Sequence, residues 1–234
     1  MGGAFFWGLI AASSLIVGGL LASWVTIGKR TLGLVMGFGA GVLVSAIAYE
    51  LVYEAVHIAR LTGFPSLGFF AGAFTFFFAD LLIGRIGGRR EGDATRAAES
   101  SMVVPLVLGI ILDGIPESVV IGLGILQGGA VSLSMLVAVF ISNLPEAAAG
   151  TVGMRASGWS RAKILLLWSA IALLCAVASA TGYAALGGAS NEVLAVVQAF
   201  AGGAMLMMLA NTMIPEAYEK AGKLAGCLLY TSPS

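Results

Sequence analysis

Long runs of apolar residues alternate with short polar stretches along almost the whole chain. Seven of these runs reach about 20 residues, the length that an α-helix needs to cross the hydrocarbon core of a bilayer. The only substantial polar stretch between them is 87–100. The pattern therefore predicts an all-α, polytopic membrane helix bundle with seven spans, at about 4–27, 32–57, 66–86, 102–126, 131–154, 164–186 and 193–217.

The composition is that of an integral membrane protein. Hydrophobic residues make up 59% of the 234 positions and charged residues only 10%, whereas soluble domains are about 25% charged. The net charge is zero and no extended basic cluster is present, which argues against a nucleic-acid partner. The two cysteines, Cys175 and Cys227, form no readable disulfide framework or metal motif. No basic segment precedes the first apolar run, so we expect it to stay as a helix rather than to be cleaved as a signal.

The C-terminal end breaks the pattern. Residues 220–226 have the character of the beginning of an eighth helix, but the remaining 227–234 are too short to cross a bilayer. We therefore expect one transmembrane domain over 1–226, with an eighth helix missing. The segment 227–234 is predicted to be a truncated or non-native tail.

The basic residues predict the orientation in the membrane. Because seven spans alternate in direction, their connections fall into two sets, and cytoplasmic connections carry the excess of Lys and Arg. Arg60 alone belongs to one set, and eleven residues belong to the other: Lys29, Arg30, Arg85, Arg89, Arg90, Arg96, Arg155, Arg161, Lys163, Lys220 and Lys223. This asymmetry predicts an outside N-terminus and a cytoplasmic loop 87–100.

Two consecutive spans carry an acid directly after a proline, in the middle of the apolar run. Glu117 follows Pro116, Glu146 follows Pro145, and Asp113 lies one helical turn before Glu117. A charged residue at the bilayer centre costs about 2.5–3.5 kcal/mol on insertion scales, so such acids indicate a functional site. Lys and Arg occur only at the ends of the seven spans, so the sequence offers these carboxylates no basic partner.

Further oxygen donors accompany the three acids. Ser142 and Asn143 lie four and three positions before Glu146, on the same helical face. Because proline has no N–H, Pro116 and Pro145 each release a backbone carbonyl one turn earlier. Such an oxygen-rich set either takes up protons or binds a divalent cation such as Mg, Mn, Ca, Fe(II) or zinc. We predict a cation site formed by Asp113, Glu117, Ser142, Asn143 and Glu146.

The second and seventh spans contain a short internal repeat. Residues 48–55 align without gaps on 210–217, which matches Glu54 with Glu216. The two spans cross in opposite directions, so Glu54 is predicted near the outer face and Glu216 near the cytoplasmic face. Oppositely oriented copies are typical of secondary transporters. We therefore predict a transport path that also includes Glu50, Glu54, Asp80 and Glu216.

The acids of this path also have structural interpretations. Asp80 is suited to a hydrogen bond with a neighbouring helix. Glu50, Glu54 and Glu216 lie near the ends of their spans, where water can solvate them. His57, the only histidine, lies at the outer end of its span, and we expect it at the membrane interface rather than in a ligand set.

These motifs resemble the ZIP family of divalent-metal transporters. Residues 113–118, Asp-Gly-Ile-Pro-Glu-Ser, are similar to the family's helix-four motif His-Asn-x-Pro-Glu-Gly, and 142–146 are similar to its helix-five polar pair followed by x-Pro-Glu. Residues 39–41 and 214–217 also look like the family, so the resemblance covers about residues 4–226. It implies eight helices with both ends outside, a cytoplasmic loop between helices three and four, and a metal site on helices four and five.

Departures from the family motifs change the expected ligand set. Asp113 stands where the family has histidine, and Gly114 stands at its asparagine position without a side-chain ligand. Asn143 occupies a position that is often acidic, and the sixth span lacks the glutamate that some members use for a second metal. The resemblance thus implies one metal site rather than two, and the missing imidazole weakens the case for a zinc preference.

Taken together, the sequence predicts a divalent metal cation transporter of the ZIP type, for zinc, iron or manganese uptake across the cytoplasmic membrane. Glu54 and Glu50 would attract the ion outside, the central acids would hold it midway, and Glu216 would receive it inside. Two groups of helices would rock against each other. The metal ion is the substrate, the lipid bilayer is the other partner, and no cofactor or enzymatic activity is implied. A homodimer is compatible with this interpretation.

Three other classes of function compete with this prediction. An intramembrane metalloprotease needs His-Glu-x-x-His, which a single histidine forbids, and Asp80 and Asp113 lack the Gly-x-Gly-Asp context of aspartyl proteases. A proton- or sodium-coupled carrier of a small solute would use the same acids. A protein that kept the fold but lost transport is the third alternative.

Overall fold

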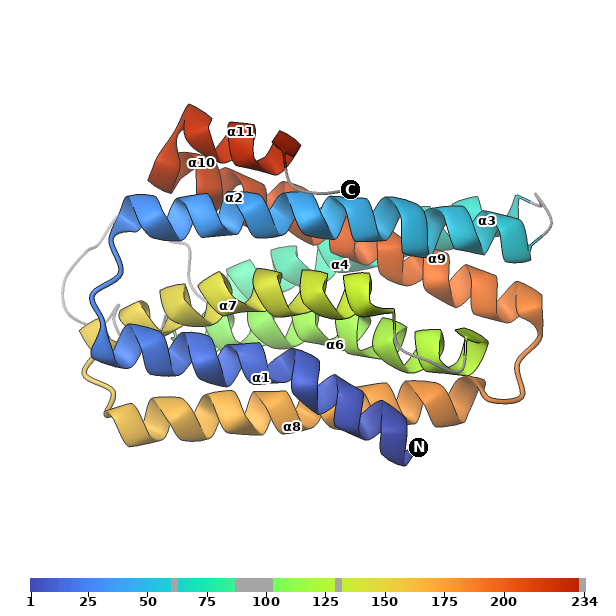
Figure 1. The fold of residues 1–234 in the computed structure, drawn as a ribbon, viewed down its shortest axis with the longest axis horizontal. Helices are drawn as coiled ribbons and strands as arrows, with labels where there is room; N and C mark the ends of the chain where they lie inside the picture. The colour runs from blue at the N-terminus through green and yellow to red at the C-terminus, as the bar shows by residue number, and fades with distance from the viewer. Residues whose placement is uncertain (60–62, 87–102, 129–131, 232–234) are drawn as a thin grey trace.

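The computed structural model of the protein describes residues 1–59, 63–86, 103–128 and 132–231. Within these ranges every regular element is helical, and seven helical stretches are long and apolar enough to cross a membrane (Figure 1). The prediction of an all-α, multi-pass membrane protein is confirmed. The spans are α1 (Gly2–Trp24), α2–η1–α3 (Lys29–Ala46, Ile47–Tyr53, Glu54–Ile58), α4 (Phe64–Ile86), α6 (Val103–Gly128), α7 (Leu133–Ala156), α8 (Arg161–Leu186) and α9–η2–α10 (Asn191–Met208, Leu209–Met213, Ile214–Ala221).

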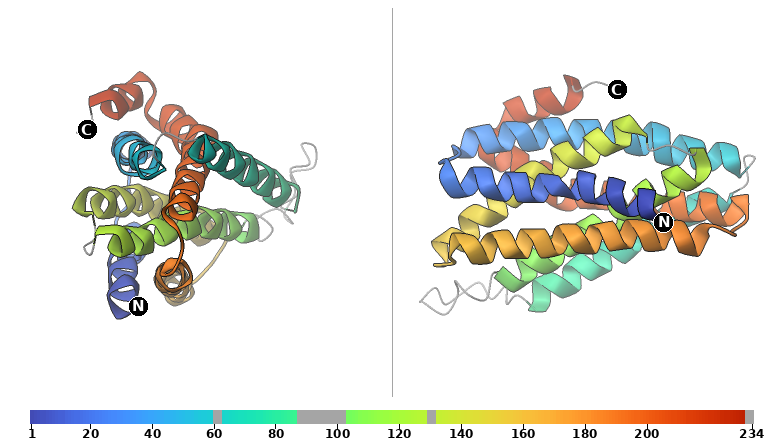
Figure 2. Two further views of the ribbon diagram at one scale, coloured as in Figure 1. Left: turned by 90° about the vertical axis from the view of Figure 1, so that its right-hand side faces the viewer. Right: turned by 60° about the horizontal axis from the view of Figure 1, so that its bottom comes forward.

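The helices pack in two groups. The first group comprises α1, α6, α7 and α8, and the second comprises α2, η1, α3, α4, α9, η2 and α10. The groups meet mainly where α2 packs on α7 and where α6 packs on α9 and α4. The end-on view of Figure 2 shows α6 and α7 between α1 and α8 on one side and α2 and α4 on the other. Functional side chains on α6 and α7 therefore lie close to the boundary between the groups.

Within each group, glycines allow helix backbones to touch. A Cβ atom at Gly72 of α4 would lie 1.9 Å from the carbonyl oxygen of Phe200, and one at Gly203 of α9 would lie 1.9 Å from that of Phe69. In the first group, a Cβ atom at Gly18 of α1 would lie 2.3 Å from the carbonyl oxygen of Leu144. Small residues of this kind let membrane helices gain close van der Waals contact, which replaces the hydrophobic driving force that lipid does not supply.

Two spans contain a π-helical segment, and the two segments begin at matching positions of the internal repeat. η1 begins at Ile47 and η2 at Leu209, the two positions that directly precede the aligned stretches 48–55 and 210–217. The spans that carry them run in opposite directions (Figure 1). A shared irregularity at equivalent positions supports the predicted inverted repeat. Because π-helical turns interrupt the regular i→i+4 ladder and are frequent at functional sites, both segments are of interest here.

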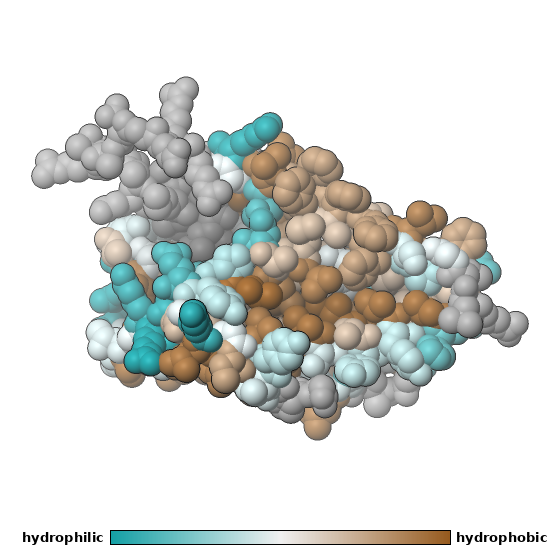
Figure 3. All heavy atoms as spheres, turned by 90° about the horizontal axis from the view of Figure 1, so that it is seen from above, coloured by the Kyte–Doolittle hydropathy of each residue, from teal (hydrophilic) through white to brown (hydrophobic). Residues whose placement is uncertain are grey.

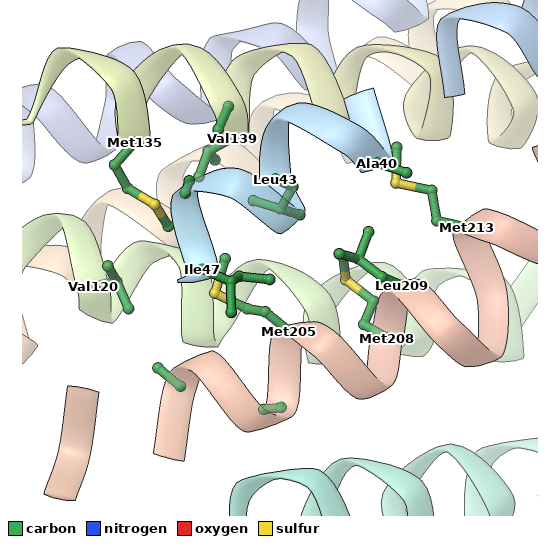
Figure 4. Packing of buried hydrophobic residues seen from close by; sticks show 14 of the residues in the cluster. Ala40, Leu43, Ile47, Val120, Met135, Val139, Met205, Met208, Leu209 and Met213 are labelled. Atoms are coloured by element: carbon green, nitrogen blue, oxygen red, sulfur yellow. The ribbon is translucent and has the colours of Figure 1, made fainter. Parts of the chain in front are cut away.

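The core between α2 and α9 is built from methionine and small aliphatic side chains. Met205, Met208 and Met213 are each 1% exposed, and Figure 4 shows Met205 beside Ile47 and Met213 beside Ala40 of α2. Methionine is unbranched and polarizable, so its flexible side chain can fill the irregular gaps beside the π-helical turns. The methionines of this span therefore belong to the packing of the second group.

The described Lys and Arg residues all lie at one end of the bundle, which we call the basic end; we call the opposite end the distal end. The basic end carries the α1–α2 and α7–α8 connections and α10, and hydrophilic residues are concentrated at the left-hand end of the face shown in Figure 3. The distal end carries α3 and the α8–α9 connection. Arg60 and the loop 87–100, both used to predict the orientation, lie outside the described residues.

Part of the predicted tail forms a helix. α11 (Lys223–Thr231) follows Gly222, which has a φ of 63°, and packs on α2 at the basic end. A Cβ atom at Gly37 of α2 would lie 2.7 Å from the carbonyl oxygen of Ala225. Residues 232–234 lie outside the described part of the chain, and the origin of the segment 227–234 stays a prediction.

Candidate functional site

Both Pro-Glu motifs lie inside continuous helices. Pro116 falls within α6 and Pro145 within α7. Each proline lacks an N–H, so the carbonyls of Leu112 and Ile141 lose their usual i+4 donor. Gly39 of α2 packs against the second of these carbonyls, and a Cβ atom at Gly39 would lie 3.3 Å from its oxygen. The boundary between the two groups therefore contains a backbone oxygen that regular helix geometry would have satisfied.

Of the three acids in the predicted site, Glu117 has the most hydrogen-bond partners. Its side chain is 1% exposed, and its Oε2 accepts a hydrogen bond of 3.0 Å from Asn143 Nδ2. Ser142 Oγ lies 3.5 Å from Glu117 Oε1 and 3.0 Å from the carbonyl oxygen of Val139. Because a hydroxyl donates one proton at a time, Asn143 is the stronger partner. The structure thus brings together Glu117, Ser142 and Asn143 as predicted, across the α6–α7 contact.

Asp113 and Glu146 extend this acidic cluster. Asp113 is 8% exposed, and no side chain or backbone group of the described residues donates a hydrogen bond to it. Glu146 is half-buried and lies within the range of electrostatic repulsion from Asp113 and Glu117. The one ion pair formed within the described residues, between Lys220 and Glu216, leaves all three central acids without a basic partner.

The three carboxylates share one region of the bundle without converging on a point. In the described part of the chain, no three His, Cys, Asp or Glu side chains come close enough together to hold a metal ion as they stand. A cation held by all three acids therefore requires a change of rotamer. Asp113 and Glu146 have that freedom because no described hydrogen bond fixes their carboxylates.

Asp80 and Glu216, the two remaining acids of the predicted path, each have a polar partner within the second group. Asp80 of α4 accepts a hydrogen bond from Asn211 Nδ2 of η2, so the expected contact with a neighbouring helix is present, and Asp80 is also an electrostatic neighbour of Asp113. Glu216 of α10 pairs with Lys220 and is an electrostatic neighbour of Glu146. Acidic groups therefore continue from the central cluster towards the basic end.

At the distal end, Glu50 and Glu54 line a cavity of about 220 Å³ between the two groups. Its walls come from η1, α3 and α9 of the second group and from α6 and α7 of the first. Glu54 is exposed and Glu50 is half-buried, so water reaches both carboxylates. Val120 and Ile121 of α6 also line the cavity, and they lie one turn along α6 from Glu117. The cavity thus ends about one helical turn from Glu117.

His57 takes no part in either acidic region. The ring is exposed, its Nδ1 lies 3.0 Å from the carbonyl oxygen of Tyr53, and the two rings stack at 4.1 Å between centroids. These contacts are local to η1 and α3, and they agree with the predicted place of His57 at the interface.

Three residues that the sequence analysis did not single out lie at the distal cavity: Gln127 and Gln198 line it, and Ser134 contacts Glu50 at its wall. Gln198 is 2% exposed and donates to the backbone carbonyl of Glu50 at 2.6 Å and to Glu54 Oε2 at 3.2 Å. Gln127 Nε2 donates to Gln198 Oε1 at 3.0 Å, and Ser134 Oγ donates to a carboxylate oxygen of Glu50. The two glutamines could have been found from the sequence, because each places an amide in an apolar run. A buried amide must form a hydrogen bond.

The chain matches no protein-family model and no curated protein sequence. The fold and the buried acids define a multi-pass membrane protein whose core holds an unpaired acidic cluster at the boundary between two packed groups of helices.

Proposed function

We propose that the protein carries a divalent metal cation, with zinc, iron and manganese as the candidate substrates, across the membrane. One observation supports this most directly: Asp113 and Glu117 are buried and Glu146 is half-buried in the bundle, and no basic side chain pairs with them in the described residues. Burial of unpaired carboxylates is costly. A divalent cation that passes through the bundle would supply the missing positive charge.

The distribution of the other acids supports a path. A cation would enter the distal cavity beside Glu50 and Glu54, move to the central acids, and leave past Asp80 and Glu216 at the basic end. The concentration of Lys and Arg at that end supports a cytoplasmic location for it, which makes the direction uptake and the N-terminus external. The motif resemblance to the ZIP family, set out above, points to the same substrate class.

The division into two groups supports alternating access. The central ligands come from α6 and α7, both in the first group, so a bound ion would move with that group as a unit. Movement of the first group against the second would expose the ion first to the distal cavity and then to the basic end. Such movement of one bundle of helices against another is the usual mode of secondary transporters.

A second candidate is a proton- or sodium-coupled carrier of a small solute. The observation that favours it is the absence of a preformed three-ligand cluster among the described residues. Protons need only single carboxylates, and these can lie apart. A multidentate metal site has to converge on one ion.

The test is cation flux into proteoliposomes that contain the full 234-residue chain. Zinc, manganese and Fe(II) are supplied outside one at a time, and an encapsulated metal indicator reports entry. The parent is compared with Glu117→Gln and Glu146→Gln, which remove a charge and keep the shape of the side chain. Glu192→Gln is the matched control, because Glu192 is exposed at the beginning of α9 and far in sequence from the cluster.

We expect the parent and Glu192→Gln to transport at least one of the three metals at equal rates. Loss of a group that only supports a metal ligand already costs about 10–100-fold, so Glu117→Gln should lower the initial rate by about 100-fold. Equal flux in all four proteins would contradict the central site. Proton flux without any metal flux in the parent would instead support the second candidate.

A further inference from the structure

Gln198 connects the two groups of helices at the distal cavity. It comes from α9 of the second group, and it accepts a hydrogen bond from Gln127 of α6, in the first group. Its own amide protons are used by two acceptors within the second group, the carbonyl oxygen of Glu50 and the carboxylate of Glu54. The Gln198 side chain thus has a partner for its oxygen and for both of its N–H groups.

The backbone carbonyl that accepts this bond belongs to a π-helical turn. Glu50 lies inside η1, where the widened turn interrupts the regular i→i+4 pairing. A carbonyl oxygen has two lone pairs, so the Glu50 carbonyl can accept a hydrogen bond from an external donor. Gln198, which is nearly inaccessible to solvent, supplies it. The second group therefore fixes the amide in place, and this presents its oxygen to Gln127.

A second hydrogen bond crosses between the groups at the same cavity. Ser134, at the beginning of α7, donates to the carboxylate of Glu50. The polar pairs at the basic end, Asp80 with Asn211 and Glu216 with Lys220, each lie within the second group. Side-chain hydrogen bonds therefore join the groups at the distal end, where the two sides would have to separate for the cavity to open.

We propose that Gln127, Gln198, Ser134 and Glu50 form a latch that holds the two groups of helices together at the distal cavity by tying α6 and α7 to η1 and α9. Gln198 is a positioning residue in this latch, because it acts through the orientation of its partners. The role of the latch as the outer gate of a transporter rests on the proposed function. The connection between the two groups does not, and it can be measured without any cation.

The test uses a cysteine reporter inside the cavity. Val120 lines the cavity from α6, is 5% exposed, and lies between Gln127 and Glu117 along the helix. Val120→Cys is introduced into the full chain, which is reconstituted in nanodiscs so that both faces are accessible, and its reaction rate with a charged maleimide is measured. The chain without the reporter corrects for Cys175 and Cys227.

Gln127→Leu and Ser134→Ala each remove one crossing bond and leave the Gln198 contacts within the second group intact. Because one hydrogen bond contributes about 0.5–1.5 kcal/mol, equivalent to a population change of about 2–10-fold, each variant should speed reporter labelling about threefold, and the pair about tenfold. Thr181→Ala is the control, since Thr181 is exposed on α8 and donates within its own helix. It should leave the rate unchanged.

Labelling rates within twofold of the parent in both single variants and in the pair would overturn the latch. The single variants carry the test if the pair does not fold. Failure of the latch would leave the flux measurements in proteoliposomes unaffected. Conversely, a chain that transports no metal but shows faster labelling would keep the latch and reject the proposed function.

Discussion

The central acidic cluster and the distal cavity both hold carboxylates without a basic partner, but they differ in where their hydrogen-bond donors come from. Glu117 on α6 is held by Asn143 on α7, and both helices belong to the first group. Glu50 on η1 is held by Ser134 on α7, which belongs to the other group. The central contact would survive a movement of one group against the other, whereas the distal contact would break.

This difference indicates that the two regions have different roles. A site whose ligands and supporting donors lie on one rigid unit keeps its geometry while it moves, which favours binding. A contact between two units adds stability to only one of their arrangements, and it therefore sets the population of that arrangement. The centre is suited to holding a cation, and the distal contact is suited to controlling access to it.

The largest expected effect comes from removing one negative charge in each region and comparing the two losses of flux. Glu117→Gln should lower cation flux by about 100-fold, because it removes a buried ligand for which no water can substitute, whereas Glu50→Gln should lower it by less than about 10-fold. The half-buried Glu50 is in contact with water, which can replace it as a ligand. The measurement is initial flux in proteoliposomes at saturating metal. A greater loss from Glu50→Gln would reverse the assignment of the two regions.

The next effect concerns the support of Glu117. Asn143→Ala removes the 3.0 Å hydrogen bond and should weaken the apparent affinity for the transported cation by about 10-fold. The maximal rate should change less, since the carboxylate remains. Asn191→Ala is the matched control, because Asn191 is exposed at the beginning of α9. An unchanged half-saturating concentration in Asn143→Ala would show that the hydrogen bond does not position the ligand.

The third effect concerns the rigidity of the second group. Gly72→Ala places a Cβ atom 1.9 Å from a backbone oxygen of α9, so α4 must move away. Overpacking of this kind costs about 1–3 kcal/mol, which for a chain of this size lowers the thermal midpoint by about 2–10 °C. In Gly84→Ala, on the same helix, the added Cβ atom meets nothing within 4 Å. Equal midpoints for both variants in detergent would contradict the close α4–α9 packing.

The smallest effect is expected at the histidine. His57→Ala removes an exposed ring that contacts only its own helix, so flux should stay within about twofold of the parent at every metal concentration. A large loss of flux would place a nitrogen ligand on the path and would revive the expectation of a zinc preference.

Much of the fold could be predicted because hydropathy and helix length determine it. The second span was predicted at 32–57, and the structure has it at Lys29–Ile58. The proximity of Glu117 to Ser142 and Asn143 also followed from the sequence, since matching Pro-Glu motifs on consecutive spans lie at the same depth. In lipid, a helix must satisfy its backbone internally, so span positions depend on local sequence more strongly than in water.

The latch could not be predicted, because it depends on which helices face each other and not on the local sequence. Gln127 and Gln198 are 71 positions apart, and an apolar helix does not reveal which neighbour it faces, because lipid and protein are equally apolar surroundings. The division into two groups is hidden for the same reason. The short repeat did point to the stretches 48–55 and 210–217, but nothing in their composition indicates a π-helical turn.

In the proposed function, Asp113, Glu117 and Glu146 hold a divalent cation. Equilibrium dialysis of the purified chain against zinc and manganese measures this without any need for transport. About one ion should bind per chain in the parent and in Glu192→Gln, and binding should be at least about 10-fold weaker in Asp113→Asn and Glu117→Gln. No bound ion in the parent, or equal binding in all four proteins, would contradict it.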